Sequence, residues 1–184
     1  MNETKGPAIP TTIRYKPIGI LRSEHRELSH IPIQPVYASG CKGEVEIFAD
    51  YEEGLQDLEG FSHIYLLYHF HEAKTTRLTV QPFLEDALHG IFATRAPCRP
   101  NPIGLSIVRL LERRNNLLLL DEVDILDGTP ILDVKPFTSR FDNRRDTQDG
   151  WQEHIAESTA QQRGRRQAMQ VSATNAKRNW KDLL

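Results

Sequence analysis

Two proline-rich loops carry the side chains of this chain that are best suited to chemistry. The first is the run 95–104, Arg-Ala-Pro-Cys-Arg-Pro-Asn-Pro-Ile-Gly. Its three prolines fix φ and withhold amide donors, so the run predicts a rigid loop and neither a helix interior nor a central strand. Arg95 and Arg99 carry guanidinium groups that suit a phosphate or a carboxylate, and Asn101 can both donate and accept. We expect Gly104 to let the chain turn from this loop into an apolar strand.

The second loop is Asp127, Gly128, Thr129 and Pro130, which again places polar groups at the mouth of a short apolar strand. Gly128 predicts either a turn with φ above zero or a close backbone approach, and Pro130 stiffens the start of the strand. For the first loop alone, a proline-braced connection with two solvated arginines is the simpler interpretation, and the second loop of the same character favours a functional role.

Other candidate reactive groups are histidines and cysteines. His69 and His71 lie two residues apart in a segment that predicts a strand, so they share a face and allow a metal site if another strand adds a carboxylate. Cys41 and Cys98 lack the CxxC spacing of a zinc knuckle, and they predict no disulfide framework. Cys98 stands between two arginines, which favour a lower pKa of its thiol and allow a nucleophilic role, but the sequence identifies no partner base.

The elements that must position these groups are mainly short strands. Residues 43–48 alternate charged and apolar side chains, and residues 61–71 are rich in aromatic and β-branched side chains. A short helical turn is expected over 50–58, ending at Gly60, and a hairpin turn over 113–116. Further strands are expected at 77–80, 90–94, 105–111, 117–125 and 131–134. This pattern predicts a mainly β protein, an antiparallel single-domain β-barrel with a few short helices and a polar C-terminal tail.

Composition agrees with one compact domain. The chain has 184 residues, 39% of them hydrophobic, and a formal net charge of −2. It contains no apolar run of the roughly 18 residues that a membrane helix needs, and its first residues lack the apolar core of a signal peptide. We therefore expect a cytoplasmic protein without a membrane partner. Basic clusters at 144–145, 163–166 and 177–178 allow contact with phosphates, although a solvated tail explains them equally well.

These residues resemble the signature of the TrmO-type tRNA adenosine-37 N6-methyltransferase family. The two loops and four further motifs match the family in order, namely Lys16-Pro17-Ile18-Gly19-Ile20 with Ser23, Pro32-Ile33-Gln34, 58–64 with Phe70-His71, and 92–95. The resemblance predicts an N-terminal extension over 1–14, a TrmO-like barrel over 15–141 and a polar, basic segment over 142–184. No glycine-rich Rossmann turn is present, so a methyltransferase interpretation depends on this resemblance.

By this resemblance, the cofactor is S-adenosylmethionine, and the family's cofactor pocket corresponds to a defined set of residues. They are Pro32, Ile33, Gln34, His71, Glu72, Arg95, Leu105, Asp127, Gly128, Thr129 and Pro130. Arg95 is the candidate donor to the cofactor's carboxylate. Ile33 stands where many members carry an arginine. The resemblance also implies a homodimer with the cofactor near the subunit interface.

The substrate implied by the resemblance is N6-threonylcarbamoyladenosine in the anticodon loop of a tRNA. Methyl transfer from a sulfonium is an in-line displacement that depends chiefly on positioning. Asp133 is a candidate acceptor for the N6 proton. Lys135, Arg99 and Asn101 are candidates to hold the threonyl carboxylate or a phosphate. An Asp133–Lys135 ion pair that closes the strand end is an equally good interpretation.

Two functions of other classes remain open at this stage. One is a metal-dependent β-barrel enzyme that uses His69 and His71, although partly buried polar histidines are more common. The other is a non-catalytic RNA-binding module with a basic tail and an aromatic-rich sheet. The favoured interpretation involves no metal.

Overall fold

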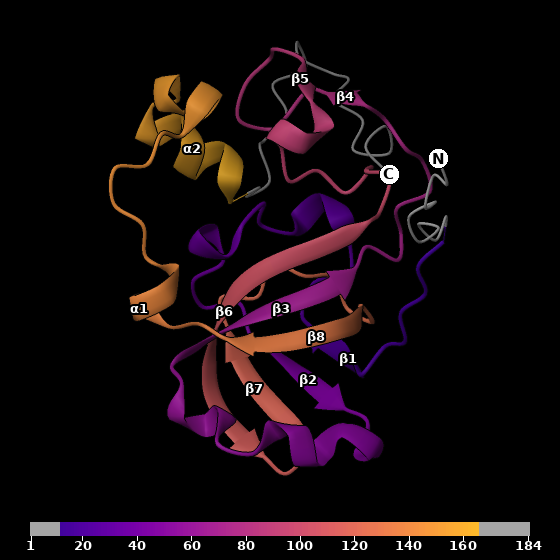
Figure 1. Cartoon of the computed structure of the whole chain (residues 1–184). Helices are drawn as coiled ribbons and strands as arrows, with labels where there is room; N and C mark the ends of the chain where they lie inside the picture. Colours follow the sequence, from indigo (N-terminus) through magenta and orange to yellow (C-terminus); the bar gives the residue numbers. More distant parts are fainter. Residues whose placement is uncertain (1–11, 166–184) are drawn as a thin grey trace, which may run out of the picture.

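The computed structural model describes residues 12–165. Its six long strands form a closed antiparallel barrel, shown in the lower half of Figure 1. In the order in which they pair, these strands are β1 (Gly19–Ser23), β2 (Gly43–Ile47), β7 (Leu117–Asp121), β6 (Ile103–Arg114), β3 (His63–His69) and β8 (Pro130–Pro136), and β8 closes on β1. The predicted antiparallel single-domain β-barrel is confirmed.

The strands form because their apolar side chains recur at every second position. In β3, Ile64, Leu66 and Tyr68 are buried, whereas His69 is exposed. The first eight residues of β6 alternate exposed and buried in the same way. The inward side chains of the six strands meet in one core. Its largest fully buried members include Leu21, Ile47, Ile64, Leu66, Leu118, Leu120, Ile125 and Ile131.

Several predicted strand limits are wrong. Residues 90–94 are not a strand, since only His89–Gly90 (β5) pairs with Thr79–Val80 (β4), and a 3-10 helix, η5 (Ile91–Ala93), follows. The expected strand over 77–80 thus shrinks to two residues. Strand β1 did not emerge from the pattern, because it is short and its two large apolar residues, Ile20 and Leu21, are adjacent and do not alternate with polar ones.

The expected strand over 117–125 ends at Asp121, and the reason is local. Asp121 Oδ1 accepts hydrogen bonds from the amides of Gly40, at 3.0 Å, and Glu122, at 2.7 Å. Glu122 then adopts a left-handed backbone with φ of 64°. This turn reverses the in-and-out alternation, so that Val123 and Ile125 are buried instead of Glu122 and Asp124.

Short helices connect the strands, as expected. The predicted helical turn over 50–58 corresponds to η3 (Ala49–Leu55) and η4 (Leu58–Gly60), and the predicted hairpin turn joins β6 to β7 through Asn115, whose φ is 54°. The remaining helices are η1 (Leu28–His30), η2 (Pro35–Tyr37), α1 (Ser139–Asp142), η6 (Gly150–His154) and α2 (Glu157–Gly164). No helix among residues 12–165 is long and apolar enough to cross a membrane.

Helices η6 and α2 pack onto loops at one end of the barrel. The Trp151 indole donates to the carbonyl of Ala93 at 2.9 Å and stacks on His89. The carbonyl of Gly164 accepts the amide of Ile33 at 2.9 Å. Figure 1 shows α2 and the β4–β5 ribbon together above the barrel. The predicted polar segment therefore begins as a docked element; the part beyond Arg165 lies outside the described residues.

Candidate functional site: a cavity at the end of the barrel

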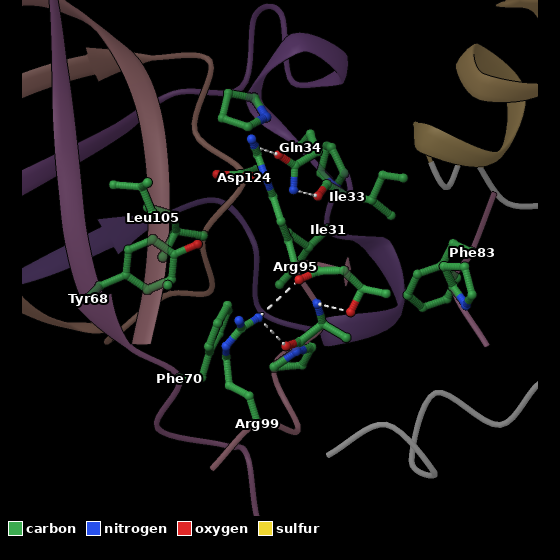
Figure 2. A pocket seen from close by; sticks show the side chains of 18 of the residues that line it. Ile31, Ile33, Gln34, Tyr68, Phe70, Phe83, Arg95, Arg99, Leu105 and Asp124 are labelled. Carbon is green, nitrogen blue, oxygen red and sulfur yellow. Dashed lines mark hydrogen bonds between the residues drawn. The ribbon is translucent and has the colours of Figure 1, made fainter. Parts of the chain in front are cut away.

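The loops above the barrel enclose a cavity of about 1520 Å³. Its walls come from six parts of the chain that are distant in sequence. These parts are residues 31–37 around η2, the end of β3 with residues 70–73, residues 81–84 after β4, the proline-rich loop 92–105, the segment 122–129 after β7, and residues 149–152 around η6. The cavity combines apolar walls, such as Ile31, Phe70 and Phe83, with polar groups from separate loops, as Figure 2 shows.

Arg95 and Gln34 meet in this cavity although they are 61 residues apart. Arg95 Nη1 donates to Gln34 Oε1, and Gln34 Nε2 donates to the carbonyl of Ile33 at 2.7 Å. Figure 2 shows the Arg95 guanidinium reaching along the wall toward Gln34 and Asp124. The amide thus orients the guanidinium without neutralising it, which leaves a positive charge for an anionic group of a ligand.

The proline-rich loop is irregular, as predicted, and side chains within it hold its shape. Arg99 Nη1 donates to the carbonyls of Thr94, at 3.2 Å, and Ala96, at 3.3 Å. Arg99 and Asn101 both line the cavity. Cys98 is fully buried, and burial raises the pKa of its thiol, so the predicted activation by the flanking arginines is wrong.

Gly104 has a different role from the expected turn, because it lies within β6. A Cβ atom there would lie 2.2 Å from Cε2 of Tyr68 on the neighbouring strand. The glycine therefore permits close approach of the Tyr68 ring, and the turn prediction is wrong. Leu105, the next residue, lines the cavity as the resemblance implied.

The second loop reaches the cavity through only one of its four predicted residues. Thr129 lines the cavity, whereas Asp127, Gly128 and Pro130 do not. Asp127 lies beside the guanidinium of Arg26 and accepts the amide of Ser23 at 3.1 Å. Gly128 has the predicted left-handed backbone, with φ of 78°. This loop thus holds the wall in place and contributes one hydroxyl.

His71 and Glu72 line the cavity beside Thr129. The Thr129 hydroxyl donates to the carbonyl of Leu126 at 2.7 Å, so it accepts from His71 Nδ1 at 3.3 Å. Glu72 lies 3.8 Å from Lys74 Nζ and 3.9 Å from His71 Nε2. Pro32, Ile33, Gln34, His71, Glu72, Arg95, Leu105 and Thr129 are thus the cofactor candidates that the fold brings together.

Asp133 and Lys135 form an ion pair, with 2.7 Å between Oδ2 and Nζ, and neither lines the cavity. Both lie on β8, opposite Leu67 and Tyr65 of β3. The fold therefore separates these two candidate catalytic residues from Arg95 and Asn101.

A polar network of Asp124, Ser106 and Tyr68, which no sequence motif indicated, lies at the cavity wall. Ser106 Oγ donates to Asp124 Oδ1 at 2.6 Å and lies 3.1 Å from the Tyr68 hydroxyl. Burial raises the pKa of Asp124 to about 7, and the nearby Arg95 guanidinium opposes this rise only in part. The one sign of this network in the sequence is that Asp124 is an acidic residue between two apolar ones, Val123 and Ile125.

The histidine pair does not form a metal site with a third ligand in the part of the chain that the structure describes. There, three potential metal ligands approach within 4.8 Å of one another only at Glu24, His25 and Cys41. His25 Nε2 lies 2.8 Å from the carbonyl of Val123. His69 is exposed, and His71 faces Thr129.

Residues 12–165 form a small antiparallel barrel with a ligand-sized cavity on its end loops and contain no nucleotide-binding α/β sheet, and this combination defines the structural class. The chain belongs to the family of the tRNA-methyltransferase O N-terminal domain, whose model matches residues 20–143. The family resemblance found in the sequence is thereby confirmed.

Two relatives and one solved structure support this membership. A "Probable S-adenosyl-L-methionine-binding protein" of Pyrococcus abyssi is 52% identical and matches 79% of each chain. The "tRNA (adenine(37)-N6)-methyltransferase" of Escherichia coli is 36% identical over 69% of this chain and 58% of that protein. A crystal structure of TrmO superposes with a TM-score of 0.67 at 40% identity, over 76% of this chain and 64% of that one. The chain thus spans less than two thirds of the named methyltransferase.

Proposed function

We propose that this protein is an S-adenosylmethionine-dependent tRNA methyltransferase that methylates N6 of adenosine 37. Family membership supports this proposal, and so does the meeting of Gln34, Arg95 and Asp124 in one cavity with apolar walls. The cavity chemistry fits the cofactor: Arg95 suits a carboxylate, Gln34 suits a hydroxyl or amine, and Phe70 and Leu105 suit the faces of a purine.

The size of the cavity supports a two-substrate reaction. Sites for single small ligands measure about 300–1,000 Å³, and this cavity of about 1520 Å³ leaves room for a nucleoside beside the cofactor. The cofactor supplies an electrophilic methyl group on a sulfonium. The protein's own contribution is to hold the target nitrogen in line with that group and to exclude water.

The finer substrate of the proposal is N6-threonylcarbamoyladenosine in the anticodon loop. Arg99 and Asn101 line the cavity and are suited to the threonyl carboxylate or a neighbouring phosphate. Arg99 uses Nη1 for the loop carbonyls, and its planar guanidinium carries further donors. Lys135 lies outside the cavity and is suited to a phosphate farther along the anticodon loop of the tRNA.

We also propose that the active form is a homodimer in the cytoplasm that needs no metal. Exposed apolar side chains on the outer face of β6, Leu105, Ile107 and Leu111, support a contact between copies beside the cavity. Sedimentation at micromolar concentration should give twice the chain mass, and chelator-washed protein should keep full activity. A monomeric active species or metal-restored activity would contradict these points.

The central experiment measures cofactor binding and product formation separately. Calorimetry should detect S-adenosylmethionine binding without RNA, which a non-catalytic RNA-binding module would not show. Nucleoside mass spectrometry should then find a methyl group added to tRNA that carries threonylcarbamoyladenosine, with much less on tRNA that carries plain adenosine 37. Equal methylation of both tRNAs would support the tRNA methyltransferase activity and reject N6-threonylcarbamoyladenosine as its specific substrate.

A further inference from the structure

Asp124 is an acidic group in the wall of the cavity that forms no ion pair among residues 12–165, although the charge of the Arg95 guanidinium acts on it from beyond salt-bridge distance. The left-handed turn at Glu122 brings it there, because this turn reverses the alternation of β7 and buries Val123 and Ile125 on either side. Among residues 12–165, no lysine, arginine or histidine lies within salt-bridge distance of the Asp124 carboxylate. A partly buried carboxylate without a counter-ion is costly, so it is a candidate for a cationic ligand group.

Neutral hydroxyls hold the carboxylate in place. Ser106 is 1% exposed and donates to Asp124 Oδ1 at 2.6 Å, and Tyr68 is 5% exposed and hydrogen-bonds to Ser106 at 3.1 Å. Hydroxyl donors orient a carboxylate without cancelling its charge. The network therefore presents a fixed negative group to the cavity, and Figure 2 places it beside the Arg95 guanidinium.

We propose that Asp124 binds the α-ammonium group of the cofactor while Arg95 binds its α-carboxylate, so that the two side chains together recognise an amino-acid zwitterion. This inference rests on the proposed function. The geometry that carries it is the juxtaposition of one positive and one negative side chain, from two separate loops, in the same wall. The two charged groups of an amino acid share one carbon atom and require such a pair.

Two other acidic residues that the resemblance implied, Asp127 and Glu72, are less suited to the ammonium group. Asp127 lies beside Arg26, with Arg22 at 4.0 Å, and does not line the cavity. Glu72 lines the cavity but lies within 4 Å of both Lys74 and His71. A carboxylate that already has cationic neighbours gains less from a further cation.

The test compares two ligands that differ in the amino-acid group. S-adenosylhomocysteine carries it and 5′-methylthioadenosine lacks it, and neither requires turnover. For Asp124→Asn, which keeps an acceptor for Ser106, calorimetry should show at least tenfold weaker binding of S-adenosylhomocysteine and less than twofold change for 5′-methylthioadenosine. Asp50→Asn, an exposed change on η3, serves as the matched control and should alter neither.

Each other outcome rejects a defined statement. If Asp124→Asn binds both ligands more weakly by the same factor, Asp124 only supports the shape of the cavity. If the variant binds both ligands normally but transfers the methyl group more slowly, Asp124 acts as a proton acceptor. Either result overturns the inference. If the wild-type protein binds neither ligand, the proposed function itself fails.

The pH dependence provides a second readout. Because the pKa of Asp124 is raised to about 7, the unliganded carboxyl is largely protonated at pH 6, and binding a cation must release that proton. Affinity for S-adenosylhomocysteine should therefore rise between pH 6 and pH 8, and Asp124→Asn should flatten the rise. Tyr68 does not contribute, because burial raises the pKa of its hydroxyl further above an ordinary value that already exceeds this range. If His71 or Glu72 caused the pH dependence of the affinity, the rise would persist in Asp124→Asn, and that result would contradict its assignment to Asp124.

Discussion

Arg95 is the side chain that we propose binds the carboxylate of the cofactor. It extends from the loop after η5, and Gln34, from the segment between β1 and β2, holds its guanidinium by an acceptor oxygen. A charged donor of this kind contributes roughly 1.5–3 kcal/mol to binding a carboxylate. Its amide partner fixes the direction of the charge, so the two residues act as one unit.

Arg95→Ala should therefore weaken S-adenosylhomocysteine binding by at least about tenfold, as measured by calorimetry on folded protein. Arg114→Ala is the control, because Arg114 pairs with Glu112 on the exposed end of β6 and should leave affinity unchanged. Equal affinity of Arg95→Ala and wild type would remove Arg95 from the site.

Asp133 offers a contrast, since its carboxylate is bound to Lys135 outside the cavity. From this position we expect Asp133→Asn to keep the turnover number within a few-fold of wild type, because an exposed ion pair contributes only about 0–1 kcal/mol. Single-turnover methylation of tRNA provides the measurement. A loss of about a hundredfold would instead support the proton-acceptor role that the sequence suggested.

At the scale of elements, the pairing of β3 with β6 places the polar network. Tyr68 lies opposite Gly104 in the register, and its ring occupies the space that a side chain at 104 would fill. This position directs the Tyr68 hydroxyl to Ser106, two residues farther along β6. One glycine thus sets the geometry of a network that ends at Asp124.

Gly104→Ala should destabilise the protein by about 2 kcal/mol, because its Cβ would overlap a ring between two paired strands. For a chain of this size the melting temperature should fall by roughly 4–8 °C. Gly54→Ala is the matched control: no atom lies within 4 Å of its added Cβ, and its φ is ordinary. If the two variants have the same melting temperature, the close approach of Tyr68 and Gly104 does not constrain the stability of the protein.

At the scale of the whole molecule, the segment after the barrel completes the cavity. Asp149, Trp151 and Gln152 line it, and α2 packs against η2, where a Cβ on Gly164 would lie 2.5 Å from the Tyr37 ring. The barrel and this segment therefore form one binding unit. A truncation that removes α2 disturbs the support of Ile33 as well as any contact with RNA.

Two truncations separate these effects. Ending the chain after Arg165 removes basic residues but keeps α2, so it should raise the Michaelis constant for tRNA and flatten its salt dependence while cofactor affinity stays constant. Ending it after Glu157 should also weaken S-adenosylhomocysteine binding, because the Gly164 contact with Ile33 is lost. Unaltered tRNA kinetics in the first truncation, at every salt concentration, would mean that the removed residues do not touch tRNA.

The sequence by itself determined the architecture and much of the cavity. Alternation of charged and apolar residues in 43–48 and the aromatic and β-branched content of 61–71 predicted strands, and prolines predicted the irregular loop in 95–104, since these signals act over a few neighbouring residues. Motif composition placed Gln34, His71 and Arg95 in one site, and the fold brings them together.

Tertiary structure decided what depends on distant partners. Asp124 followed an apolar pattern that predicted a continuing strand, and only the turn held by Asp121 and Gly40 directs it into the cavity. Gly104 signalled a turn, yet its function depends on the Tyr68 ring of another strand. Burial raises the pKa of Cys98 despite two neighbouring arginines. In each case the deciding contact or desolvation arises from segments that only the closed barrel brings together.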